Sequence, residues 1–523
     1  MNNNRELDLI LKIFYDWLAM NPQFDILMGF SMSKIFITLF IMFITIFGVI
    51  FSKAKKIDEI LNIFSFVGYL TCIALLLAAY MDISIYFDEG DDPFHIFYFQ
   101  QGFIINTYTY FSTIFIYIIV CIVCALSIDY FNDETYYINY EYFILILLSL
   151  LGIIILANST NLLIAYLGIE LQSLPLYVLV SFRRFNKYST EAGLKYFTLG
   201  GFASALYLFG TSIIYGLTGT LDIFTLSILV ENIKLLDSSL YYGIILGLSL
   251  ILSTLFFKLS NFPFHTWTPD VYTGSILPIV MFIGTISKIG AFVFLSNLTQ
   301  FVFIYMSNAF SLILTITGLS SLFIGTFGAL YQSNIKKLLA YSTIGHMGYA
   351  VLGLSTITID GLISANYYLF VYIIMNLLTF VSLIAIQDRT GGQKYLETIY
   401  DLNYIQTGNI YVSILFSTIF LSIAGIPPLL GFFNKYLILY SLIETEAYIT
   451  AFITVILSIT SAYYYLRVVK MMLFEKLIPK YEKLELSSNL ASYILVVLII
   501  INIILILLVD ETQVLFTEFF INH

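Results

Sequence analysis

Long apolar stretches follow one another along almost the whole of this 523-residue chain, and short polar breaks separate them. A helix needs roughly 20 apolar residues to cross the hydrocarbon core of a bilayer, which is about 30 Å thick. With 60% hydrophobic and only 11% charged residues, a soluble fold could not bury so much apolar surface. The pattern therefore predicts an all-α polytopic membrane protein. The net charge of −10 gives no indication of a nucleic-acid partner.

Cutting the chain at its polar breaks predicts fourteen transmembrane helices. The predicted ranges are 33–52, 62–83, 103–128, 141–158, 160–182, 193–218, 239–260, 276–297, 302–330, 335–356, 361–387, 408–428, 446–474 and 490–509. Connections after the odd-numbered helices carry thirteen lysines and arginines, whereas those on the other side carry four. Because loops rich in these residues stay on the matrix or cytoplasmic side, we expect both termini on the opposite side.

The predicted helices group into domains. Residues 1–32 are expected to form an N-terminal interfacial or partner-binding extension, because 5–18 has amphipathic helical spacing. The other parts are peripheral helices 1–3 at 33–140, a first repeat of helices 4–8 at 141–297, a second repeat of helices 9–13 at 302–475, and a loop, helix 14 and C-terminal tail at 476–523. Since five is an odd number, the two five-helix repeats would insert with inverted topology.

Proline interrupts two of the predicted helices that carry a lysine. Lys258 precedes Pro263 in "FFKLSNFPFHTW", and Lys435 follows Pro427 and Pro428 in "SIAGIPPLLGFFNKYLIL". A proline removes a helical hydrogen bond, and unpaired backbone at membrane depth needs protein or water as a partner. We therefore expect helices 7 and 12 to be broken near residues 259–264 and 425–431, beside hydrated cavities.

Four ionisable residues of the apolar stretches are the hardest to assign to a membrane surface. They are Glu170, Lys258, Lys288 and Lys435. Each charge at a helix centre costs about 2.5–3.5 kcal/mol on insertion scales. This cost favours a proton relay along a hydrated interior path, where burial and neighbouring charges adjust the protonation of a lysine. The alternative is a charge near a helix end, or an ion pair that only locks the bundle.

Several other basic residues fit two interpretations. Lys195 opens the sixth helix and suits either the relay or the membrane interface. His265, in the first break, and His346 could carry protons near neutral pH, although a buried imidazole bonded to backbone explains each equally well. Lys336 and Lys337 fit first the excess of basic residues on the matrix or cytoplasmic side. One of them could also pass protons to the relay.

The three cysteines lie inside apolar runs. They are Cys72, Cys121 and Cys124. The last two form C-x-x-C, but nothing around them offers the electropositive, reachable thiolate that redox or metal chemistry needs. We expect them to pack, and we predict no metal site.

Six stretches between residues 140 and 475 carry a family resemblance. They are "YLGIELQSLPLYVLVSF", "EAGLKYFTLGGFASALYLFG", "KLSNFPFHTWTPDVYTGS", "TISKIGAF", "QSNIKKLLAYSTIGHMGYAVLG" and "LSIAGIPPLLGFFNKYLIL". In wording and in spacing they resemble the antiporter-like membrane subunits of respiratory complex I, the NADH:ubiquinone oxidoreductase.

The resemblance implies a proton-translocating unit that quinone reduction in distant subunits drives. Its residues would be Glu170, Lys195, Lys258, Lys288 and Lys435, with His265, Lys337 and His346 as further candidates. It implies no cofactor in this chain, because flavin, iron–sulfur clusters and ubiquinone are expected in partner subunits.

The resemblance also implies partners and a location. The expected partners are other membrane-arm subunits, namely chain 4, chain 4L and accessory subunits, together with lipids such as cardiolipin. The expected location is the mitochondrial inner membrane, with the termini on the intermembrane-space side. A high content of Tyr and Phe, 41 and 48 residues, fits the AT-rich genome of an organelle.

Two other functions compete with this interpretation. A stand-alone cation/proton antiporter subunit would share the charges, and would purify without flavin or iron–sulfur partners. A non-pumping structural spacer of the membrane arm would gain stability by losing its intramembrane charges, so their retention argues against it.

Overall fold

The computed structural model describes ten stretches of the chain. They are residues 32–51, 57–88, 96–98, 102–132, 140–233, 238–388, 398–404, 410–475, 484–486 and 490–521. The predicted extension 1–32, with its helix at 5–18, lies outside the described residues except for its last residue.

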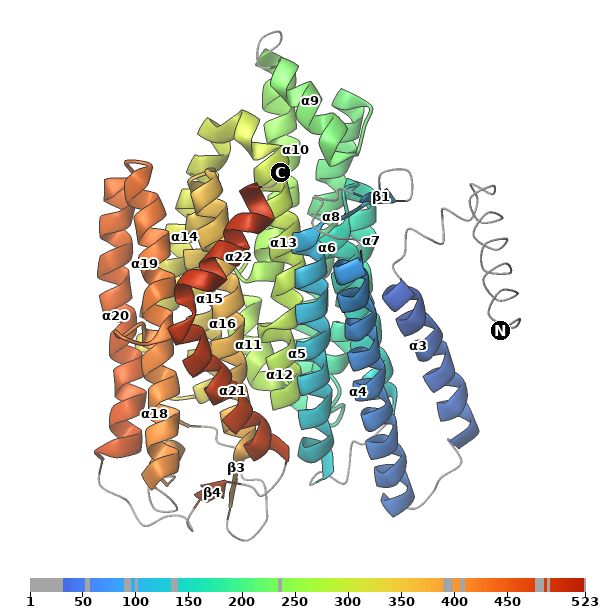
Figure 1. Ribbon diagram of the computed structural model, residues 1–523, viewed down its shortest axis with the longest axis vertical. Helices are drawn as coiled ribbons and strands as arrows, with labels where there is room; N and C mark the ends of the chain where they lie inside the picture. Colours follow the sequence, from blue (N-terminus) through green and yellow to red (C-terminus); the bar gives the residue numbers. More distant parts are fainter. Residues whose placement is uncertain are drawn as a thin grey trace, which may run out of the picture.

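Helices make up almost all of the described structure (Figure 1). The N-terminal part contains α3 (Met32–Phe51), α4 (Ile57–Asp88) and α5 (Thr107–Asn132). The first repeat contains α6 (Glu141–Asn158), α7 (Leu162–Val180), α8 (Lys187–Thr218), α9 (Ile223–Ile233), α10 (Ser238–Leu259), α11 (Trp267–Gly274), α12 (Leu277–Gly284) and α13 (Ile286–Phe301). The second repeat, after η1 (Phe303–Met306), contains α14 (Ser307–Leu330), α15 (Ile335–Ser355), α16 (Ile359–Ala385), η2 (Ile399–Tyr404), α18 (Ile410–Ala424), α19 (Leu430–Glu444) and α20 (Tyr448–Leu473).

The remaining elements follow the second repeat or connect helices. They are α21 (Leu490–Leu507), α22 (Val509–Ile521) and two antiparallel pairs, β1 (Ile96–Tyr98) with β2 (Phe103–Ile105) and β3 (Ile386–Asp388) with β4 (Leu484–Leu486). In register, Ile96 faces Ile105 and Ile386 faces Leu486.

Every one of the fourteen predicted ranges contains a described helix. Eleven stretches are long and apolar enough to cross a membrane by length and composition. In the described part of the chain, α3, α15 and α18 are not among these eleven. The predicted ranges leave out α9, α11, α19 and α22, and they treat 276–297 as one helix, whereas helical geometry breaks at Thr285, between α12 and α13. The backbone dihedrals of Thr285 are φ −117° and ψ −75°.

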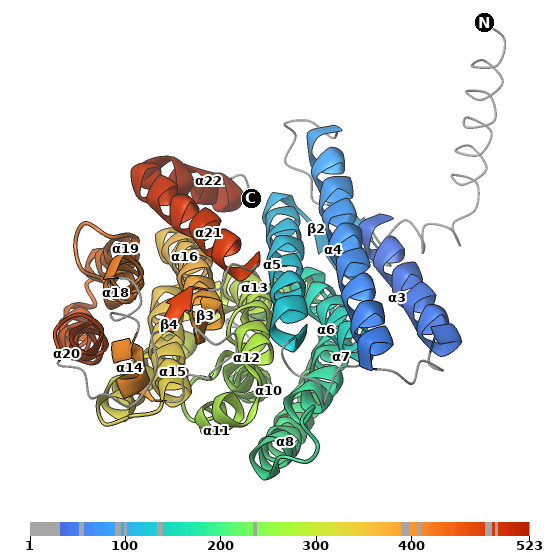
Figure 2. The ribbon, with the colours of Figure 1, turned by 90° about the horizontal axis from the view of Figure 1, so that it is seen from below.

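Seen from below, the helices form an elongated bundle (Figure 2). The N-terminal helices α3 and α4 lie at one end, α18, α19 and α20 lie at the other, and α5, α13 and α16 lie between them. The most apolar window of Leu277–Phe301 is 100% buried and that of Ile359–Ala385 is 94% buried, so these two segments form the centre of the molecule. The helices α21 and α22 pack against α16 (Figure 1).

The two repeats share an asparagine helix cap and an isolated backbone bridge. Asn161 caps α7 by accepting a hydrogen bond from Leu163 N–H, and Asn334 caps α15 by accepting one from Lys337 N–H. Each asparagine also forms an isolated antiparallel bridge, Asn161 with Asp222 and Asn334 with Thr398. The five-helix repeat predicted from the sequence is therefore built into the backbone as well.

Candidate functional site

Both predicted breaks are observed, at 260–266 and 425–429. At the end of α10, the N–H groups of Ser260 and Asn261 donate to Phe257 O (3.1 Å) and Phe256 O (2.8 Å). Ser260 has a left-handed backbone with φ 67°. This pair of bonds around a left-handed residue is the Schellman arrangement that terminates a helix.

The end of α18 has the same arrangement. The N–H groups of Gly425 and Ile426 donate to Ser422 O (3.0 Å) and Leu421 O (3.3 Å), and Gly425 has φ 82°. One residue in the left-handed (αL) conformation thus ends the helix in each repeat. It is Ser260 in the first repeat and Gly425 in the second. The two breaks leave the last carbonyls of α10 and α18 inside the bundle.

A buried lysine contacts each of these helix ends. Lys288, on α13, donates from Nζ to Leu259 O and to Ser260 Oγ, both at 3.0 Å. Lys435, on α19, donates from Nζ to Ala424 O at 2.7 Å. The carbonyl end of a helix carries partial negative charge, so it stabilises an ammonium group there. The breaks therefore place two buried lysine amines beside helix ends that favour their protonated form.

Lys258 has a different environment from the other two lysines. It lies in the last turn of α10 and is buried, yet its Nζ has no hydrogen-bond partner in the described structure. The ring centroids of Tyr196 and Phe257 are each 6.0 Å from Nζ. Glu170, half-buried on α7, lies within electrostatic reach of this lysine. Lys258 thus has a charged neighbour but no hydrogen bond that holds its ammonium group in place.

His346 lies near the second break, in a group of tyrosines. Its Nδ1 is 2.7 Å from Tyr368 Oη and its Nε2 is 3.0 Å from Tyr465 Oη, and Tyr465 also contacts Ser342 Oγ. Lys435 lies within electrostatic reach of this imidazole. The imidazole therefore has a hydroxyl partner on each side, which is the geometry that proton exchange requires.

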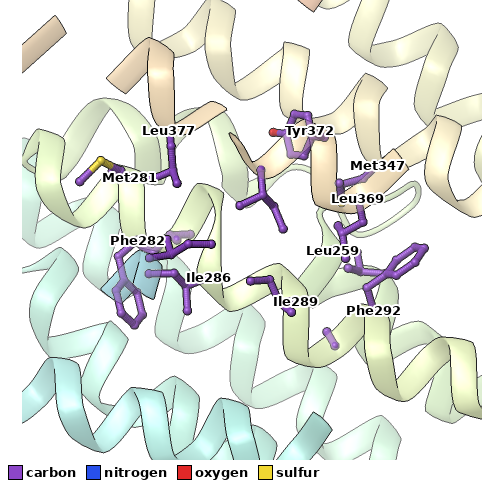
Figure 3. Close-up of a cluster of buried hydrophobic side chains, with 14 of the residues drawn as sticks. Leu259, Met281, Phe282, Ile286, Ile289, Phe292, Met347, Leu369, Tyr372 and Leu377 are labelled. Carbon is purple, nitrogen blue, oxygen red and sulfur yellow. The ribbon is translucent and has the colours of Figure 1, made fainter. Parts of the chain in front are cut away.

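One cluster of buried, mostly apolar side chains contains residues of both repeats (Figure 3). Ile286 and Ile289, which flank Lys288, belong to one buried cluster with Met347, the residue after His346. The figure places Leu259 and Leu369 in the same cluster. Among the described residues, the hydrogen bonds of Lys288 and those of His346 share no partner.

The remaining predicted site residues lie closer to the surface. Lys195 is half-exposed and forms ion pairs with Asp270 (2.7 Å) and Glu191 (2.8 Å). His265 is half-buried in the first break, and its Nδ1 has no hydrogen-bond partner in the described structure. The structure does not bring these two residues into contact with the buried lysines.

Of the two neighbouring lysines on α15, it is Lys336 that reaches a broken helix. Its Nζ donates to Ser275 O at 2.7 Å, at the C-terminal end of α11. Lys337 is half-buried, and its backbone N–H bonds the capping side chain of Asn334. The sequence alone did not distinguish the two, because both lie within one helical turn.

Sequence reasoning also missed several residues of this region. The hydroxyls of Tyr368 and Tyr465 are two among 41 tyrosines, and no local signal separates them from the others. Asp270 lies in the stretch quoted for the resemblance, but its ion pair with Lys195 spans 75 residues and cannot be read from spacing.

Comparison with known proteins gives one family. Residues 159–461 match the family described as "NADH:quinone oxidoreductase/Mrp antiporter, TM". NADH-quinone oxidoreductase subunit N of Pelagibacter ubique is 35% identical over 449 residues, which are 86% of this chain and 90% of the relative. The protein of the same name from Coxiella burnetii is 34% identical over 460 residues, 88% of this chain and 92% of the relative.

Solved structures with the same fold include a chain of "Respiratory complex I from Thermus thermophilus with bound Aureothin". It matches with a TM-score of 0.73 at 26% identity, over 92% of this chain and 98% of that chain. A chain of the Mrp complex from a Dietzia species matches with a TM-score of 0.74 at 18% identity, over 93% and 95% of the two chains. The second likeness is one of fold alone.

Proposed function

Because the chain belongs to the NADH:quinone oxidoreductase/Mrp antiporter family of transmembrane subunits, we infer that it is a proton-translocating, antiporter-like membrane subunit of respiratory complex I. The observation that carries its mechanism is the matched placement of buried lysines at two helix ends inside the bundle. Lys288 and Lys435 bind the terminal carbonyls of α10 and α18, in different repeats. A purely structural bundle has no need of two such cations.

The proton path would begin at Glu170 and Lys258. Lys258 has no hydrogen bond to break, so its charge state follows the charges around it. Approach of the Glu170 carboxylate favours the protonated ammonium, and withdrawal of that carboxylate favours release of the proton. Lys288 is the next acceptor, because its Nζ binds the carbonyl of Leu259, the residue that follows Lys258.

The second half of the path runs from Lys288 to Lys435 through His346. The imidazole lies within electrostatic reach of Lys435 and exchanges hydrogen bonds with two tyrosine hydroxyls. Within the described residues, the hydrogen bonds of Lys288 and those of His346 have no partner in common. Proton transfer needs a chain of polar groups or water, so further polar groups or water must connect the two before they can exchange a proton.

The roles of the less buried residues differ from those of the lysine chain. Lys195, Asp270 and Glu191 form an ion-pair group at the edge of α8 and α11, where protons could reach the first break. His265 lies within that break, and Lys336 rather than Lys337 holds the far end of α11. These residues are candidates for proton entry, not for central transfer.

The location and partners are proposals drawn from the family. The chain would lie in the mitochondrial inner membrane with both termini in the intermembrane space, as its lysine and arginine distribution favours. Its neighbours would be chain 4, chain 4L and accessory subunits, with cardiolipin among the bound lipids. Flavin, iron–sulfur clusters and ubiquinone would be bound by partner subunits.

Isolation in mild detergent tests the assignment to complex I. We expect the tagged chain to purify with flavin and iron–sulfur subunits and with NADH:quinone oxidoreductase activity. Purification as a small assembly that lacks flavin and iron–sulfur clusters would contradict the assignment, and would favour a stand-alone cation/proton antiporter. A solubilised sample of an unrelated inner-membrane protein with the same tag controls for carry-over.

A further inference from the structure

A second buried acid–base pair lies outside the proposed relay. Asp82 on α4 is 1% exposed and Lys34 on α3 is 7% exposed. Both belong to the N-terminal helices α3 and α4, at one end of the bundle (Figure 2), and precede the region that matches the family. The sequence pattern singled out neither Lys34 nor Asp82, and neither has a role in the proposed relay.

The carboxyl group of Asp82 has fewer hydrogen bonds than an ionised carboxylate can accept. Its Oδ1 is buried and has no partner in the described structure. Its Oδ2 is 3.4 Å from Thr113 Oγ1, and the hydroxyl of Ser33 bonds the same carboxyl group. An ionised carboxylate can accept about four hydrogen bonds, so this environment suits the neutral acid better.

The hydroxyl of Thr113 supports the same interpretation. It is 2.9 Å from Tyr110 O, which is a shorter and better hydrogen bond than the 3.4 Å contact with Asp82. A threonine hydroxyl has one hydrogen to donate. If that hydrogen goes to Tyr110 O, a lone pair of Thr113 Oγ1 faces Asp82 and can accept a hydrogen bond from a protonated carboxyl group.

The charged and titratable groups that face Asp82 come from both neighbouring helices. Lys34 approaches from α3, and Tyr117 approaches from α5, where its hydroxyl donates to Ser33 Oγ at 3.4 Å. Lys34 and Asp82 are within electrostatic reach but form no ion pair within 4.0 Å in the described structure. A salt bridge that locks α3 onto α4 would need direct contact between them.

Both members of the pair lie near an end of their helix. Lys34 is the third residue of α3, and Asp82 lies within about two turns of the end of α4. These two helix ends lie on the same side of the pair, because α3 and α4 run in opposite directions (Figure 1).

We propose that Asp82 and Lys34 form a proton-binding site that is separate from the relay, in which Asp82 binds the proton and the charge of Lys34 controls how often it is bound. With the Lys34 ammonium near, the carboxylate is favoured; when the ammonium is withdrawn or neutral, the acid is favoured. The site rests on its own geometry and does not depend on the function proposed for the lysine chain.

Labelling with dicyclohexylcarbodiimide tests this proposal on the intact complex. The carboxyl proton moves to a carbodiimide nitrogen, the carboxyl oxygen adds to the central carbon, and the acyl group then shifts to nitrogen to give a stable N-acylurea. The reagent adds whole, so nothing is oxidised and no group leaves. Because only a protonated carboxyl group starts this addition, and the reagent partitions into apolar regions, the label reports buried neutral acids.

We expect peptide mass spectrometry to find the adduct on Asp82 and not on Asp360, an exposed acid in the first turn of α16. The Asp82→Asn variant should lose that adduct. In Lys34→Met the labelled fraction of Asp82 should rise severalfold, because the ammonium that favours the carboxylate is gone. Lys187→Met, which removes an exposed lysine from the start of α8, should leave it unchanged.

Two results would overturn the proposal. Absence of label on Asp82 in the wild-type complex at mildly acidic and neutral pH would mean that the group is a permanent anion, and this result needs no variant to fold. Equal labelling in the wild type and in an assembled Lys34→Met complex would mean that Lys34 does not control the site. Subunit content after gel filtration shows whether each variant has assembled.

Discussion

At the scale of single residues, the proposed site consists of charges that helix ends stabilise. Lys288 and Lys435 donate to terminal carbonyls, and outside the lysine chain Arg467 donates to Leu330 O at the end of α14 in the same way. The partial negative charge of a helix C-terminus thus replaces the acidic partners that a buried cation would otherwise need. This explains how one half-buried glutamate can coexist with several buried lysines.

Tyr465→Phe tests the role of His346 at this scale. The substitution keeps the ring and removes the hydroxyl that lies 3.0 Å from His346 Nε2. Loss of one hydrogen bond of about 1 kcal/mol should slow NADH:quinone turnover by about fivefold if His346 passes protons. Tyr463→Phe, on an exposed position of the same helix, is the matched control. Equal turnover in the two variants would make His346 a core residue only.

The sequence predicted the lysines of the site far better than it predicted their partners. A lysine or glutamate inside an apolar run stands out because its burial is costly, so Glu170, Lys258, Lys288 and Lys435 could be selected from the chain alone. A buried tyrosine is not costly in the same way. Its hydroxyl becomes part of a site only when helices distant in sequence place it beside an imidazole, as α16 and α20 do here.

At the scale of helices, close crossings of matched pairs hold each repeat together. A Cβ atom built on Gly152 would lie 2.3 Å from Gln172 N, between α6 and α7, and one on Gly325 would lie 2.5 Å from Gly345 N, between α14 and α15. These pairs occupy the same place in the two repeats. Without a hydrophobic drive between helices in lipid, small residues at crossings supply the close packing.

Gly152→Ala should therefore destabilise the first repeat. The added methyl group meets backbone, which cannot move aside as a flexible side chain does, so we expect a loss of about 1–3 kcal/mol. Gly201→Ala is the control, because nothing lies within 4 Å of its Cβ position and alanine favours a helix by up to about 1 kcal/mol. Thermal unfolding of the purified complex measures both, and a lower midpoint for Gly201→Ala than for Gly152→Ala would contradict the packing.

The adjacent helices α4 and α5 allow a direct test of their pairing. Cys72 Sγ is 3.7 Å from Cys121 O, and Cys121 Sγ is 3.8 Å from Cys72 O, so the two thiols lie side by side. Copper-phenanthroline should join the two cysteines, and cleavage of the connection between the helices should then separate the fragments only after reduction. Cys124→Ser should keep the cross-link and Cys121→Ser should lose it. A cross-link that survives in Cys121→Ser would contradict this pairing.

The breaks in the helices were predictable because proline has a fixed local effect, whereas other irregularities were not. Pro263 and Pro427 marked both interruptions to within a few residues. No proline marks Thr285, where the chain bends between α12 and α13 and the hydroxyl bonds Met281 O. This hydrogen bond does not mark a break by itself, because Thr343 bonds Leu339 O in the same way inside the uninterrupted helix α15.

At the scale of the whole molecule, the two halves share a backbone arrangement but carry different charges. The helix caps, the bridges and the Schellman ends occur in both halves. Glu170 and Thr343, however, lie at the same distance from their capping asparagines, so a threonine in the second half takes the place of the glutamate in the first. Each half thus supplies one helix end in the interior, while the proposed relay includes a glutamate in the first half only. The central claim is that protons follow this path during quinone reduction.

Lys258→Met tests that claim most directly, because the Nζ of Lys258 has no hydrogen-bond partner within the described residues, so its removal should not disturb the fold. Methionine keeps the apolar stem, so the complex should assemble with normal subunit content and equal or greater stability. In sealed vesicles we expect NADH:quinone turnover and membrane potential to fall together by about tenfold or more, as on removal of a proton-transfer group. Lys187→Met should behave as the wild type. An assembled Lys258→Met complex with unchanged turnover and unchanged membrane potential would contradict the relay.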